Sequence, residues 1–265
     1  MNEVAAVTED SLRSGFCNEN GLTTFSVTAD VDWAPNYAVE RFLTIIDDAG
    51  VSASIYATHD QCSLKGLPNS IEVGLHPDNT RYHPEYGISR KLLDLRELFP
   101  DAVGVRCHRN FFGQNVAQLA VAAGMTYDAS VFLWKHSHLR PWIDQFGLVR
   151  LAYNWEDGIQ ADYGYGWTMD HVPFHGQGLK IFNFHPIFVY LNCPDDDYRR
   201  KIVGNYKDLT QAPKSEIEPL IYNGYGAQNF LVDLLGELKN RRAQSVTLAD
   251  IARSAVSTGR RESSR

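Results

Sequence analysis

Two aspartates, Asp30 and Asp32, stand at the end of the apolar run FSVTAD and are separated by a single residue. Residues two apart on a β-strand point to the same side, so the two carboxylates are expected to share one face. Two neighbouring carboxylates ionise together comfortably only when a cation lies beside them. A divalent metal meets this condition if one carboxylate binds the ion and the other stays free to accept a proton from water.

Histidines and an arginine follow other apolar runs at comparable positions. His76, in GLHPD, offers a nitrogen ligand, and Asp plus His with a third ligand and an open position is the pattern of catalytic zinc sites. In GVRCHR, Arg106 can hold a carboxylate ionised and oriented, while His108 can be a metal ligand or a substrate contact. His185, in FNFHP, can protonate a leaving group.

The segments that must position these residues alternate between two periodicities. Apolar runs predict strands at 25–30, 51–58, 71–76, 104–109, 125–130, 148–153 and 179–186. Helical spacing of apolar residues predicts helices at 36–50, 89–100, 115–124 and 226–242, and a short strand leading into a helical turn over 245–252. This alternation indicates βα units that form a parallel sheet or barrel.

The carboxyl ends of parallel strands share one rim, where catalytic groups gather. Polar residues near the predicted strand ends should therefore converge there. They are Asp30, Asp32, His76, Arg106, His108, Asp128 and His185.

Composition excludes several classes of protein. The 265 residues, 44% of them hydrophobic, fit one barrel of about 250 residues. A net charge of −7 argues against nucleic acid as a partner. We expect a cytoplasmic protein without a transmembrane segment. The four cysteines are scattered without a CxxC pair, no apolar run approaches the ~20 residues of a membrane span, and no signal-peptide pattern is present. The oligomeric state is left open.

The order of the motifs resembles that of the NodB-type polysaccharide deacetylases, carbohydrate esterases that hydrolyse N-acetyl groups of amino sugars. TADVDW is similar to the first motif of that family, GLHPDNT to the start of the second, GVRCHR to the third and FNFHP to the fifth. The likeness is nearest to a divergent branch associated with bacterial surface-polysaccharide gene clusters. It implies an α/β fold, a deformed (β/α) barrel in a single domain over residues 21–255, with an N-terminal extension at 1–20 and a flexible tail at 256–265.

The resemblance also implies a role for each motif residue. Asp30 would be the catalytic base, oriented by Arg106, and His185 the catalytic acid. Asp32 and His76 would hold a divalent metal ion, with zinc the expected ion. The substrate would be an N-acetylated amino sugar or polysaccharide precursor of an O-antigen or lipopolysaccharide pathway.

The third metal ligand departs from the family pattern. The second motif usually reads His, three residues, His, but Thr80 stands at the second position. Three residues could replace it: His108, His83 and Asn79. We favour His108, because a strand is a stiffer platform than a loop.

The fourth motif is represented by NWED, with Trp155 and Asp157. In the family, an acid and a tryptophan after the third motif tune the acid histidine and form a wall of the sugar site. Trp155 and Asp157 are thus expected at the substrate site, with Asp157 accepting a hydrogen bond from His185 and favouring its charged form. The alternative is that Glu156 and Asp157 only solvate a loop.

Two other functions remain open from the sequence. The protein could be a non-catalytic carbohydrate-binding relative that has kept the barrel and lost activity. The absence of the second-motif histidine, replaced by Thr80, favours this alternative. A haloacid-dehalogenase-type phosphatase also begins with D-V-D at a strand end, although Ala34 stands where that class has Thr or Val.

Overall fold

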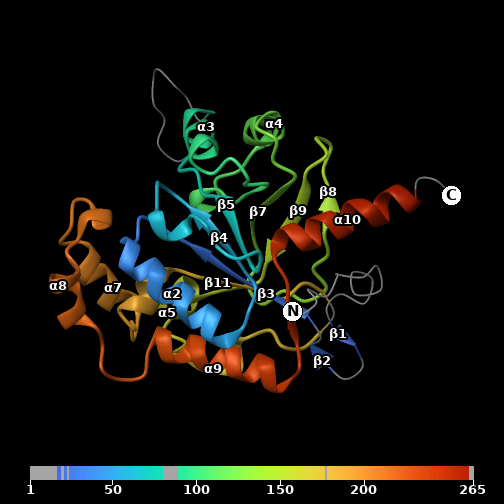
Figure 1. Ribbon diagram of the computed structural model, residues 1–265. Coiled ribbons are helices and arrows are strands. Elements are labelled where there is room, and N and C mark those ends of the chain that lie inside the picture. Colours follow the sequence, from blue (N-terminus) through green and yellow to red (C-terminus); the bar gives the residue numbers. More distant parts are fainter. Residues whose placement is uncertain (1–16, 19–20, 23, 80–88, 177, 263–265) are drawn as a thin grey trace.

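The computed structural model describes residues 17–18, 21–22, 24–79, 89–176 and 178–262 (Figure 1). Most of the predicted N-terminal extension and His83 lie outside these residues. The predicted tail at 256–265 begins inside the last helix, α10 (Leu248–Glu262). In the part of the chain that is described, no helix is long and apolar enough to span a membrane.

One sheet organises the described residues, in the strand order β10-β11-β3-β4-β5-β6-β7-β9-β8, with β12 paired to β3. All neighbours are parallel except β8 and β9. The strands are β3 (Thr24–Asp30), β4 (Ala53–Ala57), β5 (Ile71–Leu75), β6 (Gly104–Val105), β7 (Tyr127–Phe132), β8 (Trp142–Ile143), β9 (Val149–Tyr153), β10 (Trp155–Glu156), β11 (Ile181–Phe184) and β12 (Gln244–Ser245). A short hairpin, β1 (Cys17–Asn18) with β2 (Gly21–Leu22), lies apart from this sheet.

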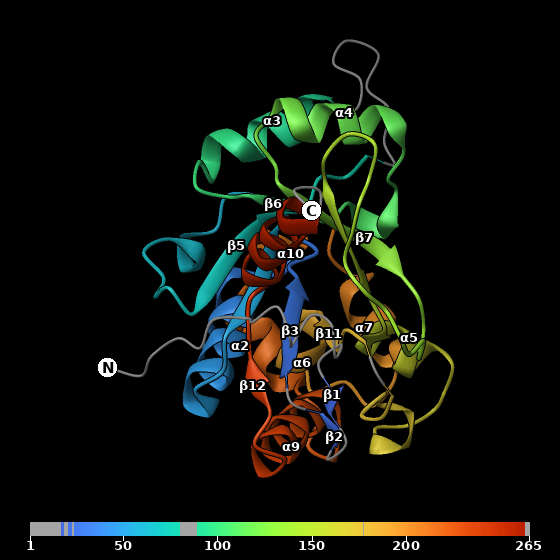
Figure 2. The ribbon, with the colours of Figure 1, turned by 90° about the vertical axis from the view of Figure 1, so that its right-hand side faces the viewer.

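The sheet curls into a half-barrel with helices on its outside, while α10 lies across one end (Figure 2). The longer outer helices are α2 (Asn36–Ala49), α3 (Ser89–Leu98), α4 (Gln114–Ala122) and α9 (Ala227–Asn240). Shorter helices follow strands β10 and β11, namely α5 (Asp157–Asp162), α6 (Pro186–Tyr190), α7 (Asp196–Val203) and α8 (Lys214–Ile217). The prediction of a single-domain, deformed (β/α) barrel is confirmed.

Alternation along β3 separates an apolar outer face from a polar inner face. On β3, Phe25, Val27 and Ala29 pack outward against the helices, whereas Thr28 and Asp30 bond to residues of the interior. Side chains on a strand alternate between its two faces. Buried polar groups need hydrogen-bond partners. The inward-facing polar side chains of β3 are therefore bonded to side chains of other strands, and the candidate site lies among these bonds.

The predicted strand at 104–109 is wrong beyond Val105. The backbone N–H of Cys107 donates to Ser130 Oγ at 2.8 Å instead of continuing the ladder, and a 3₁₀ turn, η2 (His108–Asn110), follows. The last helical turn predicted near residue 252 is likewise the start of a much longer helix, α10.

The barrel closes on β11 at Asn154, the residue that joins β9 to β10, and β10 continues the closure as a parallel partner of β11. The Asn154 amide accepts from the N–H of Ile181 at 3.2 Å and donates to the carbonyl oxygens of Leu179 and His136, both at 3.0 Å. The backbone N–H of Asn154 also donates to the Ile181 carbonyl at 3.3 Å. We call this place the Asn154 seam, because the Asn154 side chain adds its own bonds to the backbone bonds that join β9 and β10 to β11.

A glycine inside the barrel is required by close packing. Gly104 on β6 lies opposite Tyr127 on β7, and a Cβ at Gly104 would be 1.9 Å from Cζ of that ring. We expect Gly104→Ala to lower the free energy of unfolding by about 1–3 kcal/mol, because the ring has nowhere to move. Gly236→Ala on α9 is the control: a Cβ there meets nothing within 4 Å, so alanine should stabilise the helix by about 0.5–1 kcal/mol. Urea unfolding measures both, and equal effects would contradict the packing argument.

Candidate metal and catalytic site

A cavity of about 470 Å³ opens at the carboxyl ends of the strands. It is lined by Asp30, Asp32, His76, His108 and His185, among others. A larger hollow of about 1110 Å³ lies at the opposite ends of the strands, between α2, α9 and β12, and contains none of the predicted site residues. The candidate metal ligands and His185 therefore lie at the smaller cavity.

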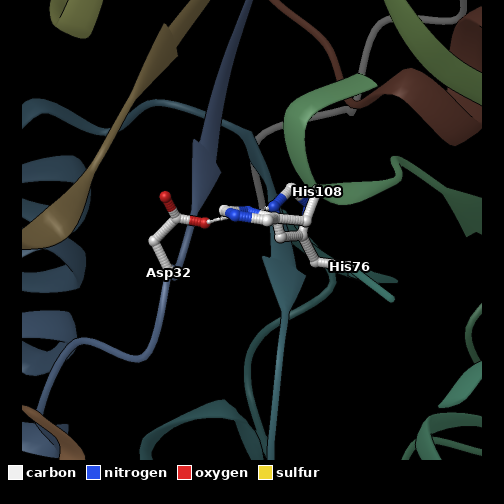
Figure 3. A group of neighbouring side chains, drawn as sticks. All are labelled: Asp32, His76 and His108. Atoms are coloured by element: carbon white, nitrogen blue, oxygen red, sulfur yellow. Dashed lines mark hydrogen bonds and ion pairs between the residues drawn. The ribbon is translucent and has the colours of Figure 1, made fainter. Parts of the chain in front are cut away.

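Three candidate ligand atoms meet at one side of this cavity, from Asp32, His76 and His108 (Figure 3). All three lie within 4.8 Å of one another. Asp32 Oδ1 lies 3.2 Å from His76 Nε2 and 3.0 Å from His108 Nδ1. His76 is buried, while Asp32 and His108 are partly open to the cavity.

This donor set fits a divalent metal ion such as zinc. In a tetrahedral site with bonds of 2.0–2.1 Å, neighbouring donor atoms are about 3.3 Å apart, close to both distances from Asp32 Oδ1. His76 Nδ1 is buried without a hydrogen-bond partner among the described residues and lies 3.7 Å from Asp30 Oδ1. Burial would raise the pKa of Asp32, but hydrogen bonds from His108 and His76 outweigh it and hold that pKa well below its usual value. The Asp32 side chain is thus an ionised carboxylate at neutral pH.

Strained backbone surrounds the same cavity. Strand β3 ends at Asp30, and the next turn places Asp32 and Trp33 in the left-handed region, with φ of 44° and 59°. Arg109 and Asn110, which also line the cavity, have φ of 54° and 55°. Such conformations cost about 1–3 kcal/mol each in residues other than glycine, and they cluster at functional sites. The turn after Asp30, and not strand alternation alone, brings Asp32 into the cavity.

Asp30 and Arg106 form a buried ion pair beside the three ligands. Arg106 Nη1 donates to Asp30 Oδ1 at 3.1 Å, and Asn183 Nδ2 donates to Asp30 Oδ2 at 2.9 Å. Burial favours the neutral acid, but the Arg106 guanidinium outweighs it and holds the pKa of Asp30 below its ordinary value. Asp30 is therefore held in place as an ionised carboxylate.

His185 faces the ligands from the other side of the cavity. Its Nδ1 bonds to Asp157 Oδ1 at 2.6 Å, its backbone N–H donates to Asp157 Oδ2 at 2.8 Å, and its Nε2 lies 3.7 Å from Asp32 Oδ2. Burial opposes a charged imidazole, yet Asp157 overrides it and raises the pKa of His185 well above its usual value. Asp157 is itself fully buried, so it holds His185 and does not line the cavity.

Two predicted site residues lie elsewhere. Asp128 on β7 faces the outside of the barrel, where Arg150 Nε donates to it at 2.9 Å. Trp155 is fully buried against Phe184 and Phe230 and does not line the cavity. Neighbouring residues on a strand face opposite sides, so on β10 the cavity receives the side chain after Trp155.

The alternatives for the third metal ligand are resolved unequally. Asn79 donates through Nδ2 to Cys107 Sγ at 3.1 Å and does not line the cavity. His83 and Thr80 lie outside the described residues. Of the candidates that the structure describes, His108 is the one that meets Asp32 and His76.

Sequence reasoning missed three residues of the cavity and its wall. Asn183 holds Asp30 and accepts from Arg106 Nη1 at 2.5 Å. Glu156 lines the cavity beside His185, and Tyr153 donates to its Oε2 at 2.9 Å. Burial raises the pKa of Glu156 above its ordinary value. Asn183 stands two residues before His185, so alternation on β11 could have identified it.

Comparison with known proteins identifies similar folds. A crystal structure from Bordetella bronchiseptica, described as a candidate polysaccharide deacetylase involved in O-antigen biosynthesis (WbmS), has a TM-score of 0.70 at 26% identity, covering 80% of this chain and 90% of that one. A candidate polysaccharide deacetylase from Mycobacterium smegmatis has a TM-score of 0.44 at 17% identity, covering 75% of this chain and 90% of that one. None of the curated proteins matches the chain.

Fold and motifs together define a NodB-type polysaccharide deacetylase of a divergent kind. The profile of the family described as "WbmS-like: Polysaccharide deacetylase" matches residues 27–202. The chain belongs to this WbmS-like family, and the resemblance inferred from the motif order is confirmed.

Proposed function

We propose that this protein is a metal-dependent deacetylase that hydrolyses N-acetyl groups of amino sugars in a surface-polysaccharide pathway of the O-antigen type. The proposal is carried by one arrangement: an ionised Asp30 beside a three-ligand site, with His185 opposite. The similar Bordetella protein, described in terms of O-antigen biosynthesis, supports the pathway.

The residues divide the reaction between them. A divalent ion held by Asp32, His76 and His108, expected to be zinc, would supply Lewis-acid activation of the acetyl carbonyl and of water. Asp30, fixed by Arg106 and Asn183, accepts the proton of the attacking water. His185, kept charged by Asp157, donates a proton from Nε2 to the departing amine, so acetate and a free amino sugar are the products.

The alternatives account for fewer of these contacts. A phosphatase of the haloacid-dehalogenase type leaves His76, His108 and His185 without a function, and the barrel is the fold of the deacetylases. A non-catalytic sugar-binding protein has no need of a buried Asp30–Arg106 pair, nor of a charged His185 next to it.

Metal content and acetate release test the proposal together. The purified protein should contain one divalent ion per chain and release acetate from at least one of UDP-N-acetylglucosamine, UDP-N-acetylgalactosamine and N-acetylglucosamine oligomers. Chelation should abolish the release, and zinc should restore it. No bound metal and no acetate with any added divalent ion would favour a sugar-binding protein. Magnesium-dependent release of phosphate from sugar phosphates would favour the phosphatase.

Replacing the partner of His185 should slow the reaction without removing the metal. Asp157→Asn keeps a side chain of the same shape but no charge beside His185 Nδ1. We expect turnover to fall by about 10²-fold, within the range of acid–base contributions, because fewer imidazoles carry the proton. Steady-state kinetics of acetate release measures this, with Asp94→Asn on the exposed face of α3 as the control. Unchanged turnover would exclude His185 as the acid.

A further inference from the structure

A column of buried side chains, with a partly buried carboxylate at its lower end, runs through the barrel beneath Asp30. We call it the inner column, and it consists of Glu72, Tyr127, Tyr56 and Arg106. Tyr127 Oη donates to Glu72 Oε1 at 2.6 Å, and Tyr56 Oη lies 3.0 Å from Tyr127 Oη. Because the Tyr127 proton is committed to Glu72, Tyr56 is the donor to Tyr127. The guanidinium carbon of Arg106 lies 4.5 Å from the centre of the Tyr56 ring.

Arg106 is held by ring faces as well as by hydrogen bonds. A second ring, that of Tyr153, lies 4.4 Å from its guanidinium carbon, so the guanidinium is sandwiched. Nε donates to the Ala129 carbonyl at 3.1 Å, and Nη1 reaches Asp30. Nη2 is buried with no hydrogen-bond acceptor among the described residues. Cation–π attraction from both rings compensates for the hydrogen bond that Nη2 lacks. The position of each ring therefore affects the stability and orientation of the Arg106 guanidinium.

Two glycines fix the tyrosine rings of the column. Gly74 pairs with Tyr56 and Gly104 pairs with Tyr127 across neighbouring strands. A Cβ at Gly74 would lie 2.6 Å from Cε1 of Tyr56, and one at Gly104 would lie 1.9 Å from Cζ of Tyr127. Both rings therefore pack directly against strand backbone. Unlike a side chain, this backbone cannot move to another rotamer. The column is rigid from β4 to β7.

The lower end of the column is fastened to α10. Glu72 Oε2 accepts from Ser54 Oγ at 2.6 Å and from the backbone N–H of Ala249 at 3.0 Å. Ser54 Oγ in turn accepts from the N–H of Leu248 at 2.8 Å. These N–H groups belong to the first turn of a long helix, whose positive end favours an adjacent carboxylate. The C-terminal helix thus anchors Glu72 although it contributes nothing to the cavity lining.

We propose that Glu72, Tyr127 and Tyr56 are positioning residues that hold the Arg106 guanidinium in the orientation that meets Asp30, with α10 as their anchor. None of the three lines the cavity, so they act only through Arg106. The expected effect of the column on turnover rests on the function proposed above. Its effect on the orientation of Arg106 does not depend on that function.

Removing one hydroxyl group from the middle of the column tests this. Tyr127→Phe keeps the ring on Gly104 but breaks the link between Tyr56 and Glu72. In the wild type, NMR should resolve the separate Nη protons of Arg106, assigned by their loss in Arg106→Lys, because its rotation is hindered. In Tyr127→Phe these signals should broaden and merge. Turnover should fall about tenfold, with KM changed less than twofold, because a fixed base loses its alignment.

Two further variants separate positioning from stability. Tyr37→Phe removes the same group from a hydrogen bond to the Ala212 carbonyl, far from the column, and should change neither the Arg106 signals nor turnover. Tyr56→Leu, which removes a ring face from Arg106, should reduce turnover more than Tyr56→Phe, which keeps it.

The outcomes are distinguishable from those of the proposed function. If Tyr127→Phe lowers Tm yet leaves the Arg106 signals and turnover as in the wild type, the column is packing only and the inference is overturned. If the wild type releases no acetate from any substrate, the proposed function fails. The Arg106 signals in Tyr127→Phe then still decide whether the column positions the guanidinium.

Discussion

Asp30→Asn is expected to keep its metal ion and lose turnover by about 10²–10⁴-fold, the range that a general base contributes. The asparagine occupies the same space beside Arg106 and Asn183, but its amide cannot accept the proton of a water molecule. The three candidate ligand atoms come from Asp32, His76 and His108, so the proposed metal site loses none of them. Metal analysis of the purified variant and the rate of acetate release measure the two properties separately.

The pairing with Arg106 makes a folding control necessary for this variant. The neutral side chain leaves a buried guanidinium without its counter-ion, and breaking a buried pair is expected to cost about 3–5 kcal/mol. Urea unfolding should show this loss while the variant is still folded under assay conditions. Wild-type turnover in a folded Asp30→Asn protein would rule Asp30 out as the base. Loss of the metal together with turnover would make Asp30 a ligand.

His108→Ala is expected to lower metal affinity by more than about 100-fold, beyond the 10- to 100-fold typical of residues that only support a ligand. The variant removes the nitrogen that lies 3.0 Å from Asp32 Oδ1. His76→Ala should lose metal and turnover alike, since the buried His76 nitrogen has no substitute among the described residues. Competition with a chromogenic chelator measures each affinity.

Other histidines serve as controls for the ligand assignment. His136→Ala, at an exposed loop residue, should bind metal as the wild type does. His83→Ala addresses the loop alternative directly. If His83→Ala loses the ion and His108→Ala retains it, the third ligand is His83 and the arrangement at Asp32 has another role.

The part of the site that could be predicted from sequence depends on strand ends. Asp30, His76 and His185 each follow an apolar run, and parallel strands deliver such residues to one rim whatever their detailed register. Motif order then identified the family. Local periodicity was therefore enough to predict the position of a site residue where a single such residue follows the end of a strand.

Residues whose position depends on register or on irregular backbone could not be predicted. The pairs Tyr56 with Gly74 and Tyr127 with Gly104 exist only because of how neighbouring strands align, and a short apolar run does not specify that alignment. Asp32 was predicted beside Asp30, but on the basis of strand alternation, whereas it reaches the cavity through a left-handed turn.

The wrong prediction that Trp155 lines the cavity, where the structure has Glu156, has a different cause. A tryptophan next to an acid was assigned to the sugar site by likeness to a family motif. On β10, strand alternation sends Trp155 to the apolar layer with Phe230 and Glu156 to the cavity. The face of a two-residue strand is set by its partner β11, which lies far along the chain.

The Asn154 seam implies uneven protection of the barrel from local unfolding. Strands β3 and β4 are joined by a ladder of four paired residues, whereas β9 meets β11 through the bonds of Asn154 and through the two-residue ladder of β10 that follows. Amide hydrogens of Asn154 and Ile181 should accordingly exchange with deuterium faster than those at the centre of β3, as expected where few bonds must break. Asn183 and His185 lie on one side of the seam and Tyr153 on the other. Transient opening of the seam would therefore change the width of the cavity, and the exchange rates of these two amides would report it.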